Sequence, residues 1–271
     1  MSSLGKRLLV AAVLITLLGA ILHFGGWVQC AVFTFGAVAA VFEMSNAFEK
    51  SDVHGFYGPA YIFAALYFLL YRLFGGEAVW VLGMLCAMLL LADRVITKVR
   101  TTQSTLFSLG MLVYPLVFFA SIAMVAEYGG SYEKSRIALL SIFAMPLMGD
   151  TFAYFVGRFF GKKKLCPELS PNKTVAGGVG GIFGGAVGGM LVYAFEGLYP
   201  AGVSPILLAA LGLICGVCGQ FGDIFASAIK RWAGIKDYSR LFSEHGGVMD
   251  RLDSVLFCAP IVYTAFKILG V

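Results

Sequence analysis

Carboxylates, bases and hydroxyls gather between residues 220 and 254 of a chain that is largely apolar. Asp223, Ser227 and Lys230 are spaced i, i+4 and i+7, so a helix through them carries all three on one face, with Arg231 beside them. A carboxylate at membrane depth is costly and is a functional candidate by default. Carboxylates hold Mg²⁺ while lysine and arginine neutralise phosphates, so this combination predicts phosphoryl or nucleotidyl transfer.

A second group of polar residues follows within the same stretch. It consists of Lys236, Asp237, His245, Gly246, Gly247, Asp250, Arg251 and Asp253. The two glycines permit a tight turn or a close backbone approach to a ligand, and acids at the start of the next helix suit its dipole. An alternative interpretation is a solvated loop with snorkelling bases, which explains the bases at the interface but not an acid inside an apolar span.

A third cluster lies further upstream. Asp150 falls inside an expected span, with Tyr154 four residues on, and the polar segment 161–174 follows. That segment offers bases and hydrogen-bond donors for phosphates: Lys162, Lys163, Lys164, Lys173, Ser170, Asn172 and Thr174. The lysines at 162–164 are explained equally well by membrane topology or by attraction to anionic lipids. The S-P-N-K-T run, in which a lysine stands between donor side chains, better fits substrate binding.

The elements that must position these residues are transmembrane helices. The 271-residue chain is 59% hydrophobic and 13% charged, with a mean hydropathy of +0.87, whereas soluble domains carry about 25% charged residues. A helix needs about 20 apolar residues to cross the hydrocarbon core. The sequence therefore predicts an all-α polytopic membrane protein with about nine spans, near residues 8–24, 27–45, 56–73, 78–93, 106–126, 137–160, 174–195, 204–229 and 254–270.

The distribution of basic residues predicts the orientation. With nine spans, sixteen of the 20 Lys and Arg residues fall on one side, which the positive-inside rule places in the cytoplasm. The N-terminus is then cytoplasmic and the C-terminus outside, and both long polar segments, 161–173 and 230–253, face the cytoplasm, where nucleotides are available. No small-residue cleavage site follows the first apolar run, so we expect a retained first helix rather than a signal peptide.

Glycine is concentrated in the segment 177–189, which reads GGVGGIFGGAVGG. A phosphate-binding loop is one interpretation of such a run. However, glycines that recur every four residues form a ridge that lets transmembrane helices approach closely. Helix packing is therefore the preferred interpretation, with Gly212, Gly216 and Gly219 as the expected partner surface.

The run S-x-x-K-R-x-x-x-x-K-D-x-x-x-x-x-x-x-H-G-G-x-x-D-R-x-D, from Ser227 to Asp253, resembles the signature of phosphatidate cytidylyltransferases, the CDP-diacylglycerol synthases. Upstream, GDTFAYFVGRFFG and SPNKT resemble that family's second motif region. The resemblance covers about residues 140–260. We therefore expect a catalytic region at 131–271, preceded at 1–130 by about five helices that carry no matched motif.

The resemblance implies that CTP and phosphatidic acid react at the membrane to give CDP-diacylglycerol and pyrophosphate. Asp223 and Asp250 would bind the catalytic Mg²⁺, with a second cation as a further expectation. The catalytic group would be completed by Lys173, Lys230, Arg231 and His245. The expected substrate-binding residues are Asp150, Ser170, Asn172, Thr174, Ser227, Lys236, Asp237, Gly246, Gly247, Arg251 and Asp253. Membrane lipids are expected partners and nucleic acid is not, and a homodimer is one candidate assembly.

Two positions depart from the family pattern. Ala176 stands where the family usually has glutamate, and Ser243 and Glu244 precede His245 where it often has Pro-Gly. The first departure leaves a catalytically silent relative as an alternative. Another lipid-linked nucleotidyl or phosphoryl transferase and an ion-coupled transporter are the others. Against a transporter, we see no inverted repeat and expect no intramembrane charge in the N-terminal half.

Overall fold

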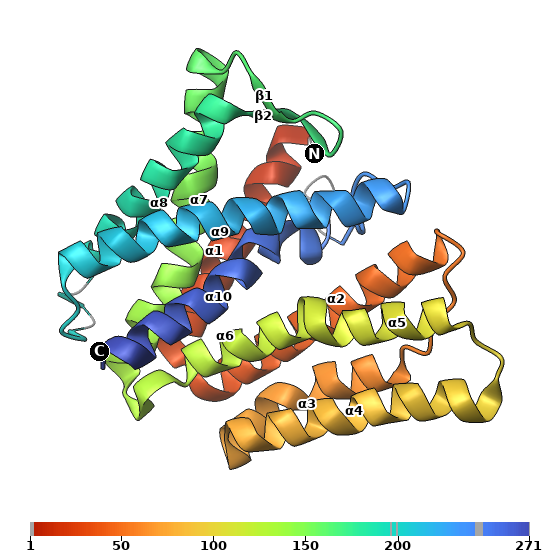
Figure 1. Cartoon of the computed structure of the whole chain (residues 1–271). Coiled ribbons are helices and arrows are strands. Elements are labelled where there is room, and N and C mark those ends of the chain that lie inside the picture. The colour runs from red at the N-terminus through yellow and green to blue at the C-terminus, as the bar shows by residue number, and fades with distance from the viewer. Residues whose placement is uncertain (1–2, 196, 199, 242–245, 271) are drawn as a thin grey trace. The chain divides into compact units, whose positions relative to one another are not determined.

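Helices form most of the chain in the computed structural model (Figure 1). The structure describes residues 3–195, 197–198, 200–241 and 246–270. The N-terminal elements are α1 (Ser3–Phe24), α2 (Gly26–Glu49), α3 (Gly58–Phe74), α4 (Gly76–Thr97), α5 (Thr102–Met111), the π-helical η1 (Leu112–Val117), α6 (Phe118–Ala126) and the short η2 (Tyr128–Gly130). They are followed by α7 (Tyr132–Phe160), β1 (Lys164–Cys166), β2 (Ser170–Thr174), α8 (Val175–Ala194), α9 (Pro205–Trp232) and α10 (Met249–Leu269).

Seven helical stretches among the described residues are long and apolar enough to cross a membrane. They are Gly26–Glu49, Gly76–Thr97, Thr102–Gly130, Tyr132–Phe160, Val175–Ala194, Pro205–Trp232 and Met249–Leu269. The other two expected spans correspond to shorter apolar helices, Ala12–Phe24 and Gly58–Phe74. The prediction of an all-α integral membrane protein is confirmed at this level, whereas nine crossings and the orientation of the termini stay predictions.

The fifth expected span, 106–126, is interrupted. A π-helical turn, η1, joins α5 to α6 and contains Pro115. Proline has no backbone N–H and cannot continue a regular helical ladder, so the candidate span Thr102–Gly130, which corresponds to this expectation, is not one regular helix.

The described chain folds into two compact units. Unit 1 contains Met1–Met124 and Ile229–Arg251. Within it, Trp232 stacks on the ring of Phe107 and meets Phe48 edge-on, so the C-terminal end of α9 packs on the N-terminal helices. Our division at residue 130 rests on motif content and stays a prediction about function.

Unit 2 contains Val125–Ala228 and Leu252–Val271. Here α7 and α8 lie side by side, with the β1–β2 hairpin connecting their ends (Figure 1). A methyl group added at Gly185 would overlap the backbone carbonyl of Gly212, and one added at Gly181 would lie 3.2 Å from the backbone carbonyl of Gly149 in α7. The packing interpretation of the glycine run is therefore confirmed. Gly219 is the exception, because it faces α7 and α10 instead of α8.

Candidate active site

Asp223 pairs with a lysine in unit 2. Its Oδ2 lies 2.7 Å from Nζ of Lys173, which β2 carries. One turn along α9, the Ser227 hydroxyl lies 3.4 Å from Oδ1 of the same carboxylate. The Asp223 side chain is 30% exposed and that of Lys173 is 22% exposed, although the Lys173 Nζ atom is itself buried.

The hairpin before α8 explains how Lys173 reaches Asp223. Strands β1 and β2 pair antiparallel, with Lys164 opposite Thr174. The Thr174 hydroxyl then accepts a hydrogen bond from the Gly177 N–H and caps α8, which is a stabilising arrangement at a helix start. The polar segment expected as a loop is thus a short sheet that holds its last lysine in place.

Asp250 is the centre of a second cluster, in unit 1. Its Oδ1 lies 2.7 Å from Lys230 Nζ, and its Oδ2 accepts hydrogen bonds from the Tyr238 and Gly247 N–H groups, both at 2.9 Å. The Asp250 side chain is 4% exposed and that of Lys230 is 12% exposed. Gly246 has φ +76°, and a Cβ there would overlap Asp250 Oδ2, so only glycine suits this turn.

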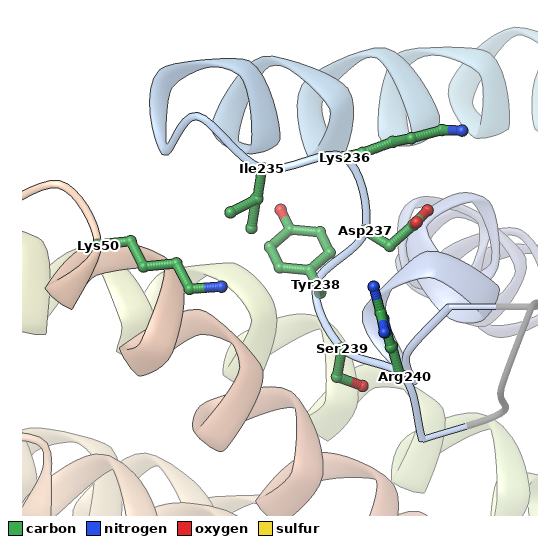
Figure 2. Close-up of a pocket in the computed structure, with 7 residues that line it drawn as sticks. All are labelled: Lys50, Ile235, Lys236, Asp237, Tyr238, Ser239 and Arg240. Carbon is green, nitrogen blue, oxygen red and sulfur yellow. The ribbon is translucent and has the colours of Figure 1, made fainter.

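A basic pocket of about 440 Å³ lies in unit 1. Figure 2 shows Lys50 reaching from the end of α2 toward Tyr238, while Lys236, Asp237 and Arg240 come from the segment after α9. Ile235 and Ser239 complete the lining. Three bases against one acid make the pocket net positive, which suits a phosphate-bearing ligand.

The other predicted site residues differ in how far they are exposed to solvent. Asp150, Asn172, Arg231, Lys236, Asp237 and Arg251 are exposed, Ser170 and Asp253 are half-buried, and Gly247 is buried. The Arg231 guanidinium lies 3.5 Å from the Ile235 carbonyl, and Asp253 accepts a hydrogen bond from the next N–H in α10. His245, with the departure at 243–244, lies outside the described residues.

One expectation about the N-terminal half is wrong. Glu43 lies within α2, a candidate span, is 1% exposed, and contacts Ser239 and the backbone of Val248 and Met249. An acid in an apolar helix is a signal that the sequence already contained. Lys50 and Arg240 were also missed as pocket residues, because in the sequence each is only one base among many near a membrane surface.

The carboxylates leave limited room for a cation. Among the described residues no three His, Cys, Asp or Glu side chains are grouped as a metal site. A carboxylate has about four lone-pair positions. Asp250 uses three of them, while Asp223 uses two, for Lys173 and Ser227. Mg²⁺ is commonly held by one or two carboxylates plus substrate phosphates, so the residues fit a cation that arrives with a nucleotide.

Comparison with known proteins adds an independent line of argument. The sequence matches the cytidylyltransferase family over residues 5–269. The chain belongs to this family. It is similar to proteins named phosphatidate cytidylyltransferase from three bacteria. It shares 40% identity over 154 residues with that of Aquifex aeolicus, covering 56% of this chain and 54% of the relative. With Bacillus subtilis it shares 37% over 146 residues, covering 54% and 51%. With Thermotoga maritima it shares 30% over 234 residues, covering 82% and 80%.

The extent of these matches differs. The chain spans about half the length of the first two curated relatives that it matches and 80% of the third. Because the family match begins at residue 5, the N-terminal helices belong to the family fold even though they carry no motif that we matched. Membership also disfavours the transporter alternative.

Proposed function

We propose that this cytidylyltransferase-family protein transfers the cytidylyl group of CTP to phosphatidic acid, giving CDP-diacylglycerol and pyrophosphate. The observation that carries the proposal is the Asp250 cluster, in which Lys230, Gly247 and Asp250 of the expected signature meet at one carboxylate. The names of the three bacterial relatives support the choice of substrates.

The proposed reaction is a direct displacement. A phosphate oxygen of phosphatidic acid attacks the α-phosphorus of CTP, a new P–O bond forms, and the bond to the β-phosphate oxygen breaks. Pyrophosphate leaves with the electron pair, so no oxidant and no covalent enzyme intermediate is needed. The protein's contribution is then positioning and charge neutralisation, as in other phosphoryl transfers.

We assign the lysines and the aspartates of the two ion pairs distinct parts in this reaction. Lys173 and Lys230 would neutralise phosphate charge, and each is pre-positioned by its aspartate at 2.7 Å. Asp223 and Asp250 would hold Mg²⁺, which when bound screens the charge of the transferring phosphates. Asp223 is the better candidate because its carboxylate is more exposed and has fewer partners.

The basic pocket is the proposed site for the CTP phosphates. Lys50, Lys236 and Arg240 come from two different parts of the chain and line one pocket. Its volume of about 440 Å³ falls within the usual range of small-molecule sites, roughly 300–1,000 Å³.

Purified protein should be incubated with labelled CTP, Mg²⁺ and a panel of lipid phosphates, including phosphatidic acid and an isoprenyl phosphate. We expect label to enter CDP-diacylglycerol with stoichiometric pyrophosphate release. Labelling of the isoprenyl phosphate alone would identify a different lipid-phosphate nucleotidyltransferase. Absence of any labelled lipid from folded protein would support the silent relative and refute the proposal.

We also propose nine membrane crossings with a cytoplasmic N-terminus, a C-terminus outside and the active site facing the cytoplasm. The test uses a cysteine-free variant with single cysteines at Ser51 or Ser131, both half-buried. If α3 crosses the membrane, three spans separate these positions, and reagents should label Ser51→Cys from the cytoplasm and Ser131→Cys from outside. Labelling of both from the same side would show that α3 does not cross.

A further inference from the structure

A buried carboxylate of α2 contacts the segment that carries the signature residues. Glu43 accepts hydrogen bonds from the Ser239 hydroxyl at 2.6 Å, the Val248 N–H at 2.9 Å and the Met249 N–H at 2.8 Å. These donors lie 196 to 206 residues further along the chain. A buried carboxylate is tolerated only when its oxygens are hydrogen-bonded, and here both oxygens are.

The two backbone donors explain why a carboxylate suits this position. Helix α10 begins at Met249, so the Val248 and Met249 N–H groups are among those that have no partner within the helix. The positive end of the helix dipole also favours an acid there. A Cβ built at Gly247 would overlap the Glu43 carboxylate, so the glycine makes room for this contact.

Glu43 and Asp250 join the same two pieces of chain. We call residues 238–239 and 246–249 together the loop base. Asp250 accepts from Tyr238 and Gly247, while Glu43 accepts from Ser239, Val248 and Met249. Each carboxylate therefore bridges both halves of the loop base. Tyr238 and Ser239 also line the basic pocket, so Glu43 is linked to the pocket wall through a single hydrogen bond.

We propose that Glu43 is a positioning residue for CTP binding. It contacts the loop base and none of the pocket's basic groups, and it holds the pocket wall and the Asp250 turn in one arrangement. This inference rests on the proposed function for its kinetic readout. It assigns a role to a helix in which the sequence shows no motif.

The test uses the variant Glu43→Gln, which keeps the size of the side chain. One acceptor oxygen becomes an NH2 group, which cannot accept a hydrogen bond from a backbone N–H. We expect kcat/KM for CTP to fall at least 10-fold, chiefly through KM, while KM for phosphatidic acid changes less than 2-fold. Ser239→Ala removes one donor and should shift KM for CTP in the same direction by about 2- to 5-fold. Glu49→Gln, an exposed position on the same helix, is the matched control and should behave as wild type.

Two further readouts separate positioning from general stability. In a double-mutant cycle, the effects of Ser239→Ala and Glu43→Gln on KM for CTP should be non-additive, because both substitutions act on the same hydrogen-bonded contact between α2 and the loop base. Hydrogen exchange should show lost protection of the amides at 248–249 in Glu43→Gln but not in Glu49→Gln. A lower melting temperature with unchanged KM for CTP would overturn the proposal and leave a purely structural residue.

The remaining outcomes also decide the question. If Glu43→Gln does not fold, Ser239→Ala is decisive, and an unchanged KM for CTP in that variant overturns the proposal. If the wild-type protein forms no CDP-diacylglycerol, the proposed function fails, but hydrogen exchange still tests the contact. Unchanged protection at 248–249 in folded Glu43→Gln would then refute the positioning role.

Discussion

Replacing each proposed metal-binding aspartate by asparagine should lower the reaction rate to a similar extent but should cost unequal amounts of stability. Asp250→Asn removes the charge that pairs with Lys230 and places an amide where the carboxylate meets three donors. Asp223→Asn removes the charge that pairs with Lys173 at a more exposed site. If both carboxylates hold Mg²⁺, each substitution should lower kcat by about 100-fold or more.

The magnitude for Asp250 follows from its burial. Removing one partner of a buried ion pair costs about 3–5 kcal/mol of stability. The Lys230 side chain is 12% exposed and can be partly solvated once its partner is lost, so we expect Asp250→Asn to cost about 3 kcal/mol, at the lower end of that range. At roughly 2–4 °C per kcal/mol, the midpoint of thermal unfolding should fall by about 6–12 °C. The Asp223 pair is exposed enough to contribute only about 0–1 kcal/mol, so its loss should shift the midpoint by at most about 4 °C.

The assay combines thermal unfolding in detergent with CDP-diacylglycerol formation, for both variants and for Glu168→Gln. Glu168 is exposed in the turn between β1 and β2, so this control should match wild type in both measurements. Equal loss of stability in the two aspartate variants would refute the argument from burial. Near-normal turnover in either variant would remove that residue from the metal site.

Three further predictions concern packing, the pocket and the family departure. Gly185→Ala should lower the midpoint of thermal unfolding, because the added Cβ would overlap the Gly212 carbonyl, whereas Gly110→Ala, whose Cβ would meet nothing within 4 Å, should leave the midpoint unchanged or slightly raise it. Equal midpoints for the two variants would contradict the close helix contact. Lys50→Ala should raise KM for CTP by about 3- to 10-fold, since an exposed charge contact contributes roughly 1 kcal/mol, whereas Lys162→Ala should leave this KM unchanged. A larger effect of Lys162→Ala would place the triphosphate at segment 161–174 instead of the basic pocket. Ala176→Glu, in the first turn of α8, should change the rate of CDP-diacylglycerol formation by several-fold or less, because a helix start favours an acid by only about 1 kcal/mol or less. A rise from no activity to robust activity would show that the native chain is catalytically silent.

The predictions that the structure confirmed came from the spacing of residues close together in the sequence. Apolar runs of about 20 residues indicate membrane helices because each such helix satisfies its own backbone hydrogen bonds, independent of its neighbours. Glycines spaced by four similarly mark a helix surface before its partner is known, and α8 packs through that surface on α7 and α9. A proline within an apolar run is also visible in the sequence, and Pro115 explains the interruption that we did not predict.

The sequence by itself determined the fold class, the family resemblance and most of the residues that could do chemistry. Only the tertiary structure decided which base meets which acid. Helix spacing places Asp223 and Lys230 on one face of α9, yet Asp223 pairs with Lys173 from a hairpin and Lys230 pairs with Asp250. The contact of Glu43 with Met249 spans 206 residues of chain. No local period relates residues so far apart, since their meeting depends on how whole helices pack.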